Sequence, residues 1–338
     1  MKSLQPWVGA AISAGFLYFA FRGVDLAAVG DGVLHANYLW LACGLLLASL
    51  SLTLRARRWQ TLFAGRRRPR FARLFGVLNV GYLVNDILPL RAGELVRALL
   101  LGQLEPISRV QILSTIVLER AVDTVAVIAM LGAVAPFVGL PRGAGRPLLL
   151  LTVAMLLLFL VMLVAAVRRD RTMRLVTRAA RFLPERLRGM AVEHADSVID
   201  GFSVLTRPLA AAEVVGLTIL VYLLAAASME AVLLSFHIQI GKAGPFFLLA
   251  TATLGLVVPS SPGAIGVWEG TVVAVLTEIF GVTKGLAATV ALVSHVVFFL
   301  PPVLFAAVYL WRSSASLKQV LSLGHGRATV PAVRVAED

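Results

Sequence analysis

Cysteine, histidine and charged side chains are all scarce in this 338-residue chain. Cys43 is the only cysteine, which excludes a disulfide framework and a cysteine-based metal site. The five histidines are scattered, so we expect neither a metal ion nor another cofactor. Charged residues make up 14% of the chain, against about 25% in a soluble domain. Because 59% of the residues are hydrophobic, the composition predicts an all-α polytopic membrane protein.

The basic excess follows the pattern of membrane topology. The formal net charge is +13, yet the arginines are concentrated in two regions. Eight arginines and no acid lie between Arg55 and Arg73, and nine arginines with five acids lie between Arg168 and Arg207. Arginine clusters beside apolar spans are typical of cytoplasmic loops and also suit anionic headgroups. The distribution therefore argues against nucleic acid as a partner.

Apolar segments divide the chain into about six full spans and two shorter pairs. The spans are predicted at residues 6–21, 38–54, 107–137, 148–167, 209–236 and 286–311. The arginines that follow residue 54, together with Trp59, are expected at the cytoplasmic interface. The segment 168–208 is expected to form cytoplasmic amphipathic helices on the membrane surface. Residues 1–312 thus form one membrane domain, and residues 313–338 a disordered cytoplasmic tail.

The two shorter pairs are predicted to be re-entrant helical hairpins. If residues 71–88 crossed completely, the second arginine cluster would lie outside, against the positive-inside rule. A hairpin over 71–104 keeps both clusters cytoplasmic. Within 243–281, the two apolar segments are shorter than the roughly 20 residues of a full crossing, which predicts a second hairpin from the opposite side. Two interrupted hairpins of opposite orientation indicate an inverted-repeat architecture.

The tip of the first hairpin carries the densest group of candidate site residues. Ionisable side chains at membrane depth are costly and usually face a cavity or a partner. Glu94 and Arg97 are three apart and share a helix face, while arginine binds phosphate with a planar fork. We expect the group to bind a lipid headgroup; the alternative is that it only holds the hairpin tip together. Its members are Arg91, Glu94 and Arg97, with Asn85 and Asp86 of lower weight.

Further polar residues lie in the later spans. Glu119, Arg120 and Asp123 form one stripe that must face the bundle interior, where the acids neutralise Arg120 or pair with the hairpin arginines. A structural role for this stripe is as plausible as a binding role. After the second break, Glu269 either binds substrate or caps the new helix. Candidates of lower weight are Trp268, Glu230 and His295. Glu230 and His295 are isolated polar residues, and each is either a proton relay or a structural residue that forms hydrogen bonds.

Three motifs resemble a known family when they are taken together. They are Asn85-x-x-Leu-Pro-x-Arg-x-Gly-Glu94-x-x-Arg97, Glu119-Arg120-x-x-Asp123 and Pro262-Gly263-x-Ile-Gly266-x-x-Glu269. Their order is similar to that in the membrane region of bacterial lysylphosphatidylglycerol synthase/flippase proteins, over roughly residues 5–311. One departure is His295, where many members carry an arginine.

The resemblance implies movement of lipid between leaflets. In two-part members the membrane region is associated with moving aminoacylated lipid, and a separate soluble domain uses aminoacyl-tRNA. Only 27 residues follow Trp311 here, so the synthase activity is not expected and the chain is not expected to be an enzyme. For stand-alone members the resemblance leaves other lipids open as substrates, including hopanoid or polyprenyl-linked ones.

The leading hypothesis is an inner-membrane lipid transporter or flippase with both termini in the cytoplasm. Its substrate would be an anionic or aminoacylated lipid, or a polyprenyl or hopanoid-type one. The alternative is a membrane-embedded enzyme or accessory subunit of lipid or envelope-glycan biosynthesis, for which only Glu119 and Asp123 offer carboxylates. A third alternative is a scaffold without a substrate. Besides lipid, a second copy of the chain and a lipid-biosynthesis enzyme are candidate partners.

Overall fold

The structure, a computed structural model, describes residues 5–64, 68–88, 92–139, 145–182, 184–257, 260–313 and 320. Within these ranges the regular structure is entirely helical, as the composition predicted. The helices are α1 (Gln5–Phe21), α2 (Leu26–Leu34), α3 (Tyr38–Thr61), α4 (Phe71–Ile87), α5 (Gly93–Leu104), α6 (Arg109–Val134), η2 (Ala135–Phe137), α7 (Gly145–Val167), α8 (Arg169–Ala180), α9 (Glu185–Phe202), η3 (Ser203–Thr206), α10 (Pro208–Ser235), α11 (Gly244–Gly255), η4 (Pro262–Ala264), α12 (Val267–Glu278) and α13 (Lys284–Arg312).

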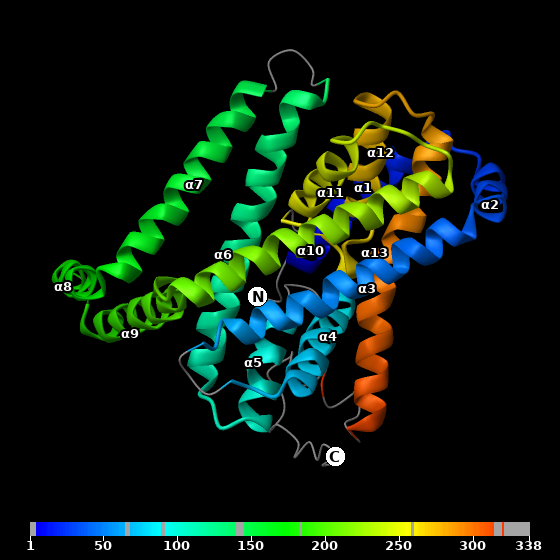
Figure 1. The fold of residues 1–338 in the computed structure, drawn as a ribbon. Coiled ribbons are helices and arrows are strands. Elements are labelled where there is room, and N and C mark those ends of the chain that lie inside the picture. Colours follow the sequence, from blue (N-terminus) through cyan, green and yellow to red (C-terminus); the bar gives the residue numbers. More distant parts are fainter. Residues whose placement is uncertain are drawn as a thin grey trace.

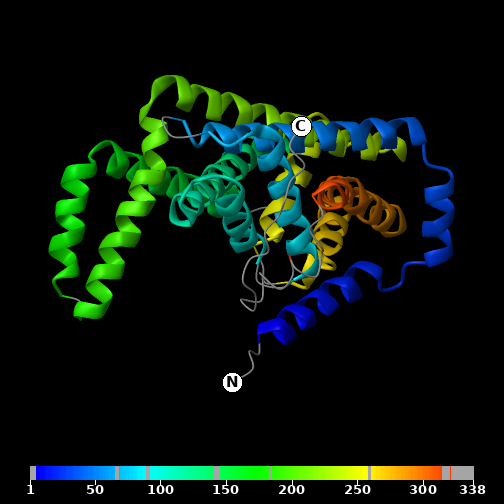
Figure 2. The ribbon, with the colours of Figure 1, turned by 90° about the horizontal axis from the view of Figure 1, so that it is seen from below.

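Helices α3 and α10 form a closely packed antiparallel pair that crosses the molecule diagonally in Figure 1 and lies along one face of it in Figure 2. Interhelical hydrogen bonds recur every seven residues: Asn37 N to Ser235 O (2.9 Å), Ser228 Oγ to Gly44 O (2.8 Å) and Ser51 Oγ to Val221 O (2.9 Å). A spacing of seven residues keeps the same faces in contact along two nearly aligned helices. Small residues and serine hydroxyls allow this close approach without an aqueous driving force.

The order of a long helix, two short helices and a second long helix occurs twice, as α3–α4–α5–α6 and as α10–α11–α12–α13. In the view of Figure 1, the short pair α11–α12 lies above the diagonal of the α3–α10 pair and α4–α5 lies below it. Helix α6 contacts α5 and α11, and α13 contacts α4 and α12, so each long helix joins the two short pairs. Seen from below, α2 lies at the opposite edge of the molecule from α7, α8 and α9 (Figure 2).

The tips of the two short pairs meet in the middle of this arrangement. Helix α4 ends where Leu88 becomes extended, and the Asn85 side chain accepts a hydrogen bond from the Gly93 amide at the start of α5 (2.9 Å). In the second pair, Gly263 and Gly266 have positive φ angles of 68° and 94°. The 3₁₀ turn η4 packs against α4, so that a Cβ added to Gly263 would lie 3.5 Å from the Asp86 carbonyl oxygen.

Gly93 is the position at which α4 and α5 come closest. A Cβ there would overlap the Gly81 carbonyl oxygen and lie 2.7 Å from Asn85 Oδ1. Because backbone atoms cannot give way as a side chain can, we expect Gly93→Ala to lower the free energy of unfolding by about 1–3 kcal/mol. Thermal unfolding in detergent would measure it. Gly216→Ala is the matched control, since its Cβ would meet nothing within 4 Å on α10; an equally stable Gly93→Ala would contradict this close crossing.

The predicted segments agree with the helices, with one clear difference. Helix α3 continues through its arginines to Thr61, and both Arg58 and Trp59 are fully buried. Inside the protein, Arg58 contacts the Asp123 carboxylate and the Thr218 hydroxyl, and Trp59 donates a hydrogen bond to Thr115. The predicted position of these two residues at the membrane interface stays a prediction.

Other parts of the predicted topology stay predictions. By length and composition, three helices among the described residues can cross a membrane, namely α3, α10 and α13. The expected cytoplasmic segment 168–208 is helical in α8 and α9, whereas its place on the membrane surface is untested. Of the predicted tail, the structure describes only Ser313 and Val320.

Candidate functional site

A cavity of about 290 Å³ lies between the central helices and the two short pairs. One part of its lining is polar and the other is aromatic and aliphatic. The polar part includes Arg55, Tyr82, Asp86, Arg120, Asp123 and Tyr222, and the apolar part includes Leu249, Trp268, Phe298 and Phe299. A mainly apolar hollow with a few convergent polar groups is the usual form of a small-molecule site.

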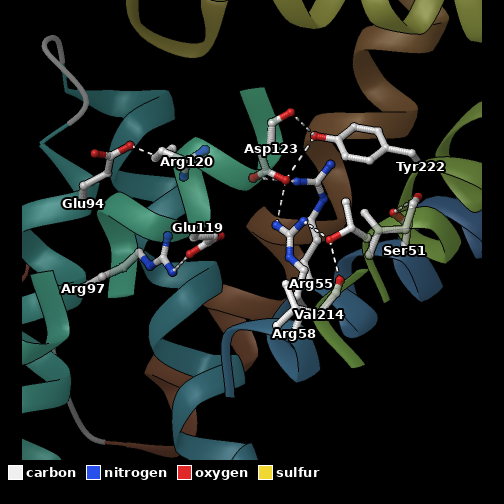
Figure 3. A network of polar contacts seen from close by, with 12 residues as sticks. Ser51, Arg55, Arg58, Glu94, Arg97, Glu119, Arg120, Asp123, Val214 and Tyr222 are labelled. Atoms are coloured by element: carbon white, nitrogen blue, oxygen red, sulfur yellow. Dashed lines mark hydrogen bonds and ion pairs between the residues drawn. The ribbon is translucent and has the colours of Figure 1, made fainter. Parts of the chain in front are cut away.

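Asp123 on α6 organises the polar wall (Figure 3). Its Oδ1 atom lies 2.7 Å from Arg58 Nη2 and accepts a hydrogen bond from the Tyr222 hydroxyl at 3.1 Å. Its Oδ2 atom lies 3.5 Å from Arg55 Nη1, and the Arg55 guanidinium lies 5.3 Å from the centre of the Tyr222 ring. Two arginines from α3 therefore share one carboxylate from α6.

Arg97 and Glu119 form a separate, fully buried ion pair. Arg97 Nη2 donates to Glu119 Oε2 at 2.5 Å, and the side chains are 1% and 0% exposed. The Arg97 guanidinium also lies 3.9 Å from the centre of the Trp59 ring, whose Nε1 donates to Thr115 Oγ1 at 3.1 Å. Neither residue of the ion pair lines the cavity. Their predicted role in binding stays a prediction.

Arg120 and Glu94 form a third pair, half-exposed beside the cavity. Arg120 Nε lies 2.9 Å from Glu94 Oε1. Glu94 and Arg97 were expected to share one face of the hairpin. Both bind α6: Glu94 pairs with Arg120, and Arg97 pairs with Glu119. Of the two pairings predicted for the α6 stripe, pairing with the hairpin arginine is confirmed for Glu119. The direct ion pair of Arg120 is with Glu94, while Glu119 and Asp123 each bind an arginine from another helix.

The second short pair contributes a polar group of its own. Glu269 Oε2 accepts a hydrogen bond from the Gly266 amide at 2.7 Å, which confirms the predicted cap of α12. Glu269 Oε1 lies 2.6 Å from His295 Nδ1 on α13. Trp268 Nε1 donates to Ser294 Oγ at 3.0 Å, and its ring lines the cavity.

The remaining predicted residues have different environments. Asp86 lines the cavity, and its Oδ2 atom is buried without a hydrogen-bond partner among the described residues. Asn85 caps α5 as described above. Glu230 is partly buried on α10. Arg91 lies outside the described residues, so its position stays a prediction.

Three residues around Asp123 were not predicted as site residues: Arg55 and Tyr222, which line the cavity, and the buried Arg58. Clustered arginines at the end of an apolar span suggested a cytoplasmic loop. The heptad spacing held a signal for Arg58, because Asn37, Gly44, Ser51 and Arg58 are seven apart and the first three face α10. No comparable signal marks Tyr222 in the sequence.

Comparison with known proteins agrees with the motifs and the helical architecture. No curated protein matches the sequence significantly. The family described as the lysylphosphatidylglycerol synthase TM region matches residues 7–306, which is most of the chain and includes both short pairs and the cavity. The protein therefore belongs to the lysylphosphatidylglycerol synthase transmembrane-region family.

Proposed function

We propose that the protein is a lipid transporter that moves the headgroup of an anionic lipid through the cavity between its two short helix pairs. The observation that carries this proposal is the sharing of Asp123 by Arg55 and Arg58 at the cavity wall. Two guanidinium groups beside one carboxylate leave an excess positive charge in an apolar region. A lipid phosphate would compensate that charge with charge-assisted hydrogen bonds.

The shape of the cavity supports a route for a lipid. Its polar wall suits a headgroup, and Trp268, Phe298 and Phe299 form an apolar wall beside it. Val257, which also lines the cavity, is exposed at the end of α11. Acyl chains can therefore stay among apolar surfaces while the headgroup crosses. The membrane would be the bacterial inner membrane, with both termini in the cytoplasm.

The repeated helix order supports an alternating-access mechanism. Helices α3 and α10 are antiparallel, and on this proposal the four-helix unit that begins with α3 would be inverted relative to the unit that begins with α10. The pairs α4–α5 and α11–α12 would be re-entrant hairpins from opposite sides that meet at Asp86 and Gly263. Inverted repeats with broken helices at the substrate site are the usual architecture of secondary transporters.

The alternative of an enzyme finds less support in the geometry. Glu119 is enclosed with Arg97, and Asp123 is bound by two arginines and a tyrosine. Both carboxylates are therefore already engaged by side chains of the protein, and Glu119 does not line the cavity. Substrates, a second copy of the chain and an enzyme partner stay predictions.

Headgroup translocation in proteoliposomes tests the proposal. A trace of fluorescent phospholipid would be incorporated, and dithionite would quench the dye in the outer leaflet. We expect quenching beyond half with the wild type. Arg55→Gln should slow translocation by about 10–100-fold, since a charge-assisted hydrogen bond contributes about 1.5–3 kcal/mol. The matched control is Arg57→Gln, whose guanidinium points elsewhere and pairs with Glu213 at 2.8 Å.

The probes would include anionic, aminoacylated and polyprenyl-phosphate lipids. Quenching that stops at half with every probe would overturn the proposed function. Equal slowing by Arg55→Gln and Arg57→Gln would overturn the assignment of the cavity wall as the headgroup site.

A further inference from the structure

Asp86 combines three features that no other carboxylate among the described residues shares. It lines the cavity, it belongs to the last turn of α4, and its Oδ2 atom is buried without a hydrogen-bond partner among the described residues. Its peptide carbonyl faces Gly263 at the point where the two helix pairs meet. An ionised carboxylate in such a place is costly unless a proton, a cation or a partner compensates it.

The charged neighbours of Asp86 are already engaged. His295 of α13 is held by Glu269, whose Oε1 atom lies 2.6 Å from His295 Nδ1. The turn η4 supplies no ionisable group. Other ionisable groups on α4 and on the helices packed against it include Glu94 and Arg97 of α5, Arg55, Arg57 and Arg58 of α3, Tyr309 of α13, and Arg73 and Tyr82 of α4. Of these, the arginines and Glu94 have partners in ion pairs. Lys284 and Arg312 lie at the two ends of α13.

The charges around the cavity then depend on the proton of Asp86. Arg120 is balanced by Glu94. Arg55 of the wall and the buried Arg58 behind it contribute two positive charges and Asp123 one negative charge, so this group carries one positive charge. An ionised Asp86 would cancel it and leave no charge for a phosphate to compensate. With Asp86 protonated, the positive charge remains, and a singly charged headgroup makes the cavity neutral.

We infer that Asp86 is a proton-binding site that couples proton movement to lipid movement. The inference rests on the proposed function, because the coupled ligand is the anionic headgroup. The proton passes from water on one side of the membrane to the Asp86 carboxylate, and from there to water on the other side. No covalent bond of the lipid forms or breaks. By linkage, a bound headgroup favours proton uptake, and the proton favours headgroup binding to the same degree.

The distribution of lipid between leaflets under a pH gradient tests this coupling. Proteoliposomes with a trace of fluorescent phosphatidylglycerol would carry a gradient of one pH unit, with the membrane potential held at zero. One proton moved with each lipid should shift the steady-state leaflet ratio by up to about tenfold toward the alkaline side, because one pH unit corresponds to a tenfold ratio. Asp86→Asn and Asp86→Ser should return the ratio to one. The control Asp31→Asn removes an exposed carboxylate on α2 and should keep the wild-type ratio.

An infrared measurement locates the proton independently of transport. At neutral pH, the carbonyl stretch of a protonated carboxylic acid should be present in the wild type and absent in Asp86→Asn. Should the variants move no lipid, this difference decides whether Asp86 carries the proton, and its absence overturns the inference.

The outcomes separate the two proposals. If the lipid equilibrates to a leaflet ratio of one under the pH gradient, proton coupling is overturned, whereas the proposed function as a lipid transporter still stands. A wild type that moves no lipid overturns the proposed function, and the coupling with it. A wild-type shift that persists in both Asp86 variants overturns the assignment to Asp86.

Discussion

Glu119→Ala is expected to lower the free energy of unfolding by about 3–5 kcal/mol, because it leaves the buried Arg97 guanidinium without its counter-charge. Arg97 is 1% exposed, so water cannot replace the lost carboxylate. The Trp59 ring offsets only part of the loss, since a cation–π contact contributes about 2 kcal/mol when desolvated. Thermal unfolding in detergent, followed by tryptophan fluorescence, measures the difference. The matched control is Glu213→Ala, which breaks the more exposed pair with Arg57 and should cost no more than about 1 kcal/mol.

A double replacement separates the loss of an ion pair from the loss of a binding group. Arg97→Met with Glu119→Leu removes both charges while keeping much of the volume, so we expect most of the stability to return. If the stable double variant still translocates lipid, the pair is structural. If it is stable but inactive, the predicted role of these residues in binding gains support. A double variant as unstable as Glu119→Ala would contradict the ion-pair explanation.

Much of the helical framework could be predicted because its signals are local. Long apolar runs give the long helices, and Pro-Gly breaks separate α4 from α5 and α11 from α12. The capping role of Glu269 could also be proposed from its position in the first turn after a break. By contrast, the length of α3 was underestimated. A hydropathy pattern cannot show that Arg58 is satisfied by an acid 65 residues further along the chain.

The pairing of charges could be predicted only in part, because it depends on how helices rotate about their axes. Sequence spacing placed Glu94 and Arg97 on one face, and both do face α6. Which acid each arginine binds depends on the crossing of α5 over α6. The position of α5 in turn depends on its close contact with α4 at Gly81 and Gly93. Tyr222 reaches Asp123 only because the heptad contacts align α10 with α3. Such long-range geometry leaves little trace in a single sequence.

Asp123→Asn is expected to lower the free energy of unfolding by about 3–5 kcal/mol in detergent or in a neutral lipid, because Arg55 and Arg58 then lose the carboxylate that they share. Arg58 is fully buried, so it cannot turn toward water. The amide keeps the shape of the side chain and can still accept the hydrogen bond from Tyr222. The control Tyr222→Phe removes only that hydrogen bond and should lower the free energy of unfolding by about 1 kcal/mol. Thermal unfolding measures both changes.

The same variant also shows what the free arginines bind. A ligand that binds only the folded state raises stability in proportion to RT ln(1 + [L]/Kd). Since Asp123→Asn exposes more positive charge to the cavity, an added anionic phospholipid should raise its Tm more than that of the wild type. A neutral lipid at the same concentration should not. Equal responses of the two proteins to the anionic lipid would mean that Arg55 and Arg58 serve only the fold, and the headgroup site would have to lie elsewhere.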